Sequence, residues 1–152
     1  MQTSSVNPLL FSPPLIFHMP NYRYLEHTSD LYIEGSGASP GEAIESVAQG
    51  LFDSINVSVS GSVHEIEITE SGSDTEDMII NLFTRVLAEM DAEGRQGIWL
   101  SVKNIDIESN KVQAVLRTSE GKAKLHVKAV TFHGFELLAQ DGKTTLRILF
   151  DI

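Results

Sequence analysis

The sequence predicts a single-domain α+β fold, in which two amphipathic helices pack on mostly antiparallel β-sheet structure. Segments with strand and helix periodicity alternate over the first half of the chain, and from Ile98 onward only strand-like, two-residue alternation is found. A chain of 152 residues is long enough for one hydrophobic core. Consecutive strands joined by short turns pair antiparallel, so the second half predicts antiparallel structure.

The first 20 residues differ in character from the rest. The stretch Leu9–Phe17 is apolar, but its prolines are incompatible with a helix, and no basic segment precedes it as in a secretory signal. We expect residues 1–20 to be an N-terminal extension, either poorly ordered or packed as an extended arm, and residues 21–152 to be the domain. Met19 is an alternative start of the protein.

The domain begins with two strands and a helix. Tyr22–Glu26 and Leu31–Glu34 alternate apolar and polar residues, as strands do. Ser39–Glu42 (SPGE) is a capping box with proline at the first helical position. The helix that follows has one apolar face, formed by Ile44, Val47, Ala48, Leu51, Phe52 and Ile55.

A second strand–helix pair follows. We expect Val57–Thr69 to be a loop and then a strand, and Ser73–Glu76 (SDTE) to be a second capping box. The predicted helix ends before Gly94 and has an apolar face formed by Ile79, Leu82, Phe83, Val86, Leu87 and Met90. Turn residues Asn110 and Asp141 then separate the remaining strands, which are predicted at Ile98–Glu108, Val112–Thr118, Leu125–Leu138 and Thr144–Phe150.

The charge and composition exclude several classes of function. With 11 basic against 21 acidic residues and a net charge of −10, the chain is unsuited to direct nucleic-acid binding. The acidic surface suits a basic protein partner, a divalent cation or solubility alone. The absence of cysteine excludes disulfides and thiolate-ligated metals, so a bound metal would be held by carboxylate, imidazole or carbonyl groups, which favours hard cations. No apolar run is long enough to span a membrane.

Polar residues interrupt the predicted strands at several candidate sites. Glu26–Asp30 (EHTSD) is either a turn or a site where His27 and Asp30 converge on a cation or a proton. At the tail, Asp151 adjoins the carboxylate of Ile152; such a pair suits a hard cation, although chain ends commonly fray.

Two further candidates have equally simple structural explanations. Lys128 and His133 are an odd number of residues apart, so they lie on opposite faces of a regular strand unless a bulge intervenes. Each is either functional or a surface group that protects a strand edge. Asp53 falls opposite the apolar face of the first helix, which indicates a solvated position. The chain contains no glycine-rich phosphate loop, GxSxG elbow or HExxH zinc motif, so nothing in it requires catalysis.

Together these segments resemble the archease family. The resemblance covers residues 22–152 and includes the strand leading into EHTSD, the helix around Leu51–Asp53 (LFD), and the acidic start of the second helix. Its most specific part is Val127–His133 (VKAVTFH), followed by Ile148–Ile152 (ILFDI) at the end of the sequence. Phe150 departs from the family pattern, because an aliphatic residue is usual there.

The resemblance implies a cytoplasmic, non-enzymatic activator of the GTP-dependent RNA ligase that joins tRNA exons. Such a protein promotes transfer of GMP onto the ligase and supports multiple turnover. The resemblance also implies a divalent-metal site, which we expect to take calcium, with magnesium or manganese as alternatives. Its implied ligands are Asp30, Asp151, Ile152 and, more weakly, Asp53, with Lys128, His27 and His133 contacting the partner or supporting the ligands.

Other functional classes remain open at this stage. The same acidic residues are compatible with a metal-dependent hydrolase, since a bound cation activates water. A chaperone-like binding module would expose an apolar surface, for which Leu9–Phe17 is the only indication in the sequence.

Overall fold

The computed structural model describes residues 3–6 and 19–152. The strands are β1 (Thr3–Val6), β2 (Asn21–Leu25), β3 (Asp30–Gly37), β4 (Asn56–Ser71), β5 (Gln96–Asp106), β6 (Lys111–Ala123), β7 (Ala129–Gln140) and β8 (Lys143–Asp151), and the helices are α1 (Pro40–Ile55) and α2 (Thr75–Glu93). Within the predicted extension, β1 pairs with Val63–Ile66 of β4. The apolar stretch Leu9–Phe17 lies outside the described residues.

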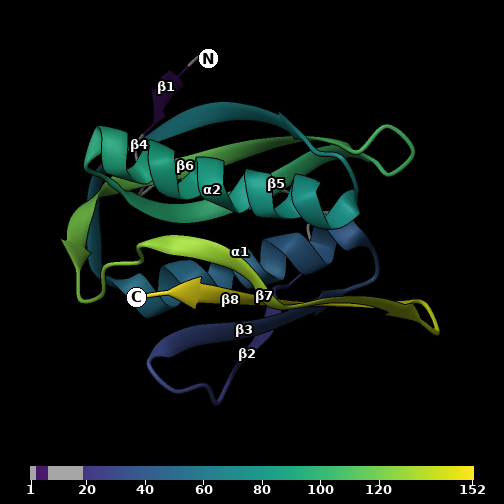
Figure 1. The fold of residues 1–152 in the computed structure, drawn as a ribbon. Coiled ribbons are helices and arrows are strands. Elements are labelled where there is room, and N and C mark those ends of the chain that lie inside the picture. The colour runs from purple at the N-terminus through teal and green to yellow at the C-terminus, as the bar shows by residue number, and fades with distance from the viewer. Residues whose placement is uncertain (1–2, 7–18) are drawn as a thin grey trace.

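The described strands form two antiparallel sheets, in the orders β1-β4-β6-β5 and β2-β3-β8-β7. Figure 1 shows α1 between the two sheets and α2 in front of the upper one. Helix α1 contacts β3 and β8 of one sheet and β5 of the other, while α2 contacts β4 and β7. The predicted α+β class is therefore confirmed, with the strands divided between two sheets. Neither helix in the described part of the chain is long and apolar enough to cross a membrane.

Helix α1 begins and packs as its sequence predicts. The Ser39 hydroxyl accepts a hydrogen bond from the Glu42 amide (3.2 Å), and Pro40 occupies the first turn. The Glu42 carboxylate in turn accepts from the Ala38 amide (3.1 Å). Every residue of the predicted apolar face is buried. Burial of this face against both sheets, rather than helix propensity, accounts for most of the helix's stability.

Helix α2 starts one residue later than predicted. Its cap is Asp74, whose side chain accepts from the Asp77 amide (2.7 Å), and the Asp77 carboxylate accepts from the Ser73 amide (2.9 Å). Ser and Asp are comparable caps, so local chemistry does not choose between them. The other end is confirmed, because Gly94 closes the helix in the left-handed conformation (φ 62°).

Three strand predictions were also wrong at their boundaries; β6, predicted at Val112–Thr118, continues to Ala123. Strand β4 starts at Asn56, directly after α1, whereas a loop was predicted there. Its serine-rich first part pairs with Glu120–Lys122 of β6, which supplies ladder hydrogen bonds that local sequence does not reveal. Strand β7 begins only at Ala129, and the preceding segment is pinned by two backbone bonds, from the Lys124 amide to the Ile55 carbonyl and from the Lys128 amide to the Asp151 carbonyl (both 2.8 Å).

A row of alternating charges crosses the outer face of the β2-β3-β8-β7 sheet. Arg23 on β2 and Arg147 on β8 each approach the Glu34 carboxylate on β3 at 2.7 Å, and Arg147 also bonds Glu136 on β7 at 2.8 Å. The Glu34 side chain is only 15% exposed. Hydrogen bonding from Arg23, followed by that from Arg147, lowers the pKa of Glu34 below its ordinary value, although partial burial opposes the shift.

This row predicts a defined pH dependence. Because the pKa of Glu34 is lower in the folded state, its contribution to stability is present above the ordinary pKa of about 4.3 and is lost as the pH falls through the folded value. We expect Glu34→Gln to lower the free energy of unfolding by about 1–2 kcal/mol at pH 7, and the deficit to shrink towards pH 3. Urea midpoints at both pH values measure this. Glu136→Gln, at a 60% exposed side chain, is the control and should change little.

Candidate functional site at the paired ends of β3 and β8

The EHTSD segment forms the loop between β2 and β3. Ser29 takes the left-handed conformation (φ 64°), which reverses the chain just before β3. The loop places the His27 Nδ1 3.1 Å from an Asp30 carboxylate oxygen. Asp30 is the first residue of β3, so its backbone is held by the sheet while its side chain remains partly exposed.

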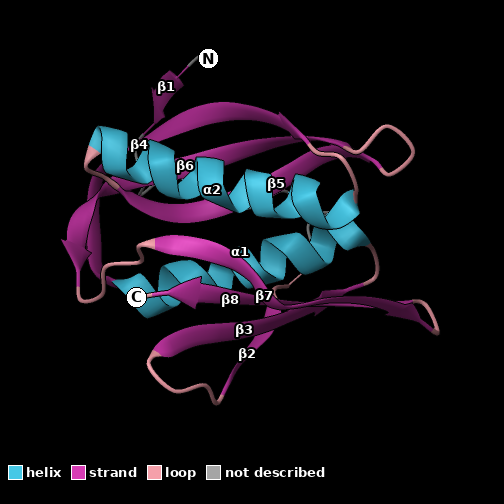
Figure 2. Ribbon diagram, viewed as in Figure 1, coloured by secondary structure: helices cyan, strands magenta, loops and turns pink. Residues whose placement is uncertain are grey.

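The structure brings Asp30 and Asp151 together. They stand directly opposite each other in the β3–β8 ladder, and residues so paired have side chains on the same face of the sheet. Figure 2 shows the β2–β3 loop and the C-terminal end of β8 at the same end of the lower sheet. We call Asp30 and Asp151, with His27 beside them, the acidic site. Two adjacent carboxylates repel each other in the absence of a counter-charge, and hard cations prefer such oxygen ligands.

The other predicted ligands are placed differently. Ile152 follows Asp151 directly, and its half-buried side chain packs against the hydrophobic core. Asp53, on α1, accepts hydrogen bonds from the Tyr22 hydroxyl and from Gln49 Nε2 (3.0 Å). Burial, with the bond to Asp53 as the second cause, raises the pKa of the Tyr22 hydroxyl. Among the residues that the structure describes, no three His, Asp or Glu side chains are grouped so as to hold a metal ion.

The strand register explains why Asp53 is separated from the acidic site. Tyr22 stands opposite Gly35, an odd number of residues from Asp30 along β3. Side chains alternate between faces, so Tyr22 and its partner Asp53 lie on the helix-covered face, whereas Asp30 lies on the other. Asp53 is exposed, in agreement with the solvated position indicated by the helical pattern.

Lys128 and His133 flank the acidic site without obeying strand alternation. Lys128 precedes β7, and its amide donates to the Asp151 carbonyl. The register between β7 and β8 shifts between Thr131 and Glu136, and His133 lies within this bulge. The His133 ring lies 6.2 Å from that of His27, edge to face. The predicted opposite placement on a regular strand therefore does not apply.

Tyr32 is a member of this surface that sequence reasoning did not single out. Its ring packs edge-on against His27 with the centroids 5.9 Å apart, and its hydroxyl donates to the Gly134 carbonyl at 2.5 Å. Tyr32 lies two residues after Asp30 on the same strand, and therefore on the same face. Strand periodicity alone could have identified it as a neighbour of Asp30, but its bond to β7 depends on the fold.

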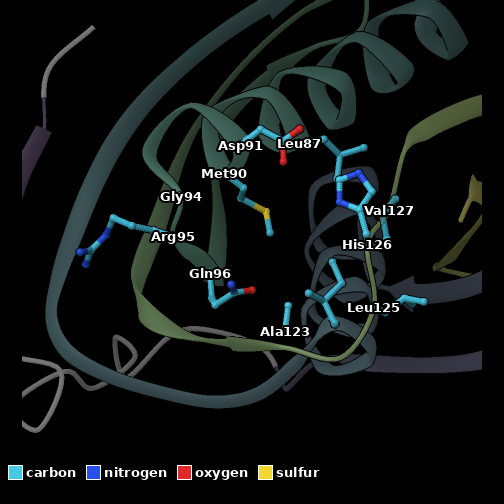
Figure 3. A pocket seen from close by; sticks show the side chains of 11 residues that line it. Leu87, Met90, Asp91, Gly94, Arg95, Gln96, Ala123, Leu125, His126 and Val127 are labelled. Carbon is cyan, nitrogen blue, oxygen red and sulfur yellow. The ribbon is translucent and has the colours of Figure 1, made fainter.

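A separate pocket of about 210 Å³ lies at the C-terminal end of α2. Figure 3 shows Met90, Gln96 and Leu125 around it, with Arg95 directed away. Its polar lining also includes Asp91 and His126, but none of the residues predicted to bind a metal lines it.

Comparison with known proteins agrees with the resemblance seen in the sequence. The model of the archease protein family (MTH1598/TM1083) matches residues 22–152. The archease of Pyrococcus furiosus is 31% identical over 148 residues, covering 88% of this chain and all of that protein. The archease of Sulfolobus acidocaldarius is 27% identical over 139 residues, with the same coverage of both chains.

Solved structures share the fold. Protein 1598 of Methanobacterium thermoautotrophicum superposes with a TM-score of 0.64 at 21% identity, covering 86% of this chain and 98% of that one. A Thermotoga maritima protein, described as an archease and possible chaperone, gives a TM-score of 0.61 at 24% identity, covering 90% and 99%. At these identities the structures establish the fold alone, whereas the family model covers the whole domain from Tyr22 to the last residue. This chain belongs to the archease family.

Proposed function

We propose that this protein is a non-enzymatic activator of the GTP-dependent RNA ligase that joins tRNA exons, promoting guanylylation of the ligase and multiple turnover. The observation that supports this most is the pairing of Asp30 with Asp151 in the β3–β8 ladder of a family member. Two segments far apart in the sequence supply carboxylates to one exposed end of the molecule. An activator that works by binding needs such a surface, and needs no nucleophile or catalytic base of its own.

The acidic site has the donor chemistry of a divalent-cation site. Asp30 and Asp151 would hold the ion, with Ile152, backbone carbonyls and water completing the shell. We propose calcium as the bound ion, with magnesium and manganese as alternatives. All three ions accept carboxylate and water oxygens as ligands. A bound cation would neutralise the two carboxylates. As its ligands, Asp30 and Asp151 would then hold the ends of β3 and β8 together.

The neighbouring side chains have supporting roles in this proposal. His27 orients the Asp30 carboxylate through their 3.1 Å contact, and the His133 ring packs against His27. Lys128 holds the end of β8 through its amide, and its exposed side chain is available to the partner. Asp53 belongs to the opposite face of the sheet, so we expect it to contribute least.

The test is a ligation assay with the cognate RNA ligase, GTP and a divalent cation, at substoichiometric ligase. We expect the wild-type protein to accelerate guanylylation and allow several turnovers. Asp30→Ala and Asp151→Ala should each reduce the activation at least about ten-fold, since each removes one of two paired ligands. Glu67→Ala removes an exposed acid on the other sheet and is the matched control.

A thermal-unfolding titration with calcium, magnesium and manganese measures cation binding separately from activation of the ligase. The wild-type protein and Glu67→Ala should be stabilised by the preferred ion, and the two aspartate variants should not. An active ligase that is indifferent to the wild-type protein would refute the activator proposal. Hydrolytic turnover lost in Asp30→Ala would then favour the metal-dependent hydrolase, and suppression of aggregation of unrelated proteins would favour a chaperone, as the Thermotoga maritima description suggests.

A further inference from the structure

Among the phenylalanines that the structure describes, Phe132 is solvent-exposed, and its neighbour His133 packs against His27 of the acidic site. Phe132 is 54% exposed, whereas Phe52, Phe83 and Phe150 are at most 1% exposed. Single exposed hydrophobic residues are common on protein surfaces, so exposure alone identifies nothing. Phe132 is distinguished by how its backbone is held and by what surrounds it.

Phe132 lies in the bulge of β7, where the regular ladder with β8 is interrupted. Thr131 stands opposite Leu149 and Glu136 opposite Arg147, so residues 132–135 face a single residue of β8. Bulges of this kind commonly redirect side chains next to functional sites. The bulge is fixed rather than loose, because Gly134 takes a left-handed conformation (φ 73°) and its carbonyl accepts the Tyr32 hydroxyl bond.

Direct contacts connect the bulge to the acidic site. His133, next to Phe132, packs against the His27 ring, and His27 contacts Asp30. Asp30 and Asp151 are the charged residues paired at this end of the sheet, with the exposed Glu26 in the loop before Asp30 and the exposed Lys128 in the segment before β7. Before a cation binds, this end of the sheet therefore carries more acidic than basic residues, and complements a basic rather than an acidic partner surface.

The geometry points to Phe132 as the anchor by which the acidic site docks on its protein partner, the ring entering an apolar pocket bordered by basic residues. This inference rests on the proposed function, in which that partner is the RNA ligase. Interfaces are commonly dominated by one or two aromatic side chains in a pocket, surrounded by polar contacts that set orientation. A rigid bulge lowers the entropic cost of presenting the ring.

The test compares two alanine variants of the same strand. Phe132→Ala should raise the dissociation constant for the ligase about 30-fold or more, as removal of an aromatic hot spot does. Leu138→Ala, at a 59% exposed residue beyond the bulge, is the matched control and should change affinity less than about three-fold. Neither variant should alter the cation-dependent thermal shift. An unchanged shift would show that the acidic site is intact.

The outcomes separate this inference from the proposal on which it rests. If the wild-type protein binds and activates the ligase while Phe132→Ala behaves identically, Phe132 is not the anchor and the activator function stands. If the wild-type protein does not bind an active ligase, both fall together. Equal losses in Phe132→Ala and Leu138→Ala would overturn the anchor as well, because they would indicate a broad apolar contact instead.

Discussion

Gly35→Ala should lower the free energy of unfolding by about 3 kcal/mol, or the melting temperature by about 6–12 °C. An added Cβ at Gly35 would lie 2.6 Å from the Val47 amide nitrogen and 2.8 Å from the Ala43 carbonyl oxygen. Both are backbone atoms of α1, so no rotamer change relieves the clash, and the helix must move away from β3. Chemical denaturation followed by circular dichroism measures the loss.

Gly142→Ala is the matched control for this prediction. It removes the same glycine flexibility from the unfolded chain, and no atom lies within 4 Å of its new Cβ. Its left-handed backbone (φ 73°) limits the expected cost to about 1 kcal/mol. Val47→Ala should not rescue Gly35→Ala, because the backbone nitrogen stays in place. A Gly35→Ala protein as stable as wild type would mean that α1 does not pack on β3 as described.

The helices and most of the sheet structure were predictable from sequence because their signals are local. The apolar face and cap of α1 are correct residue by residue, since proline, serine and glutamate each act within one turn. The cap of α2 was misplaced because Ser73 and Asp74 are nearly equivalent as local capping residues. The first part of β4 was missed because its ladder partner, Glu120–Lys122, is distant in sequence.

The acidic site was predictable only in part. The resemblance named Asp30 and Asp151, but their direct opposition depends on the antiparallel register of β3 and β8, which no local pattern specifies. Asp53 is separated from them by the alternation of faces along β2 and β3, and this follows only once the pairing of Tyr22 with Gly35 is known. The bulge that contains Phe132 likewise leaves no mark in the period-two pattern beyond Gly134, which takes a left-handed conformation.

Phe150→Ala should destabilise the protein by about 3–5 kcal/mol, and should also weaken the response to divalent cations. The ring of Phe150 is fully buried and packs edge-to-face on Phe83, with centroids 5.7 Å apart. Phe150 pairs with Leu31 in the ladder, immediately beside the pairing of Asp30 with Asp151. Losing the ring therefore removes core packing and loosens the paired ends of β3 and β8, which carry the two carboxylates.

Phe83→Ala separates these two effects. It creates a comparable cavity on the α2 side of the same ring contact but keeps every side chain of the β3–β8 ladder, so it should cost a similar free energy of unfolding yet leave the cation-dependent thermal shift intact. Phe150→Leu keeps a large apolar side chain at this position and should cost about 1.5 kcal/mol or less, with the cation response retained. If Phe83→Ala and Phe150→Ala reduce the cation response equally, global stability governs cation binding. If only Phe150→Ala reduces it, the packing beneath the tail positions Asp151 for its role.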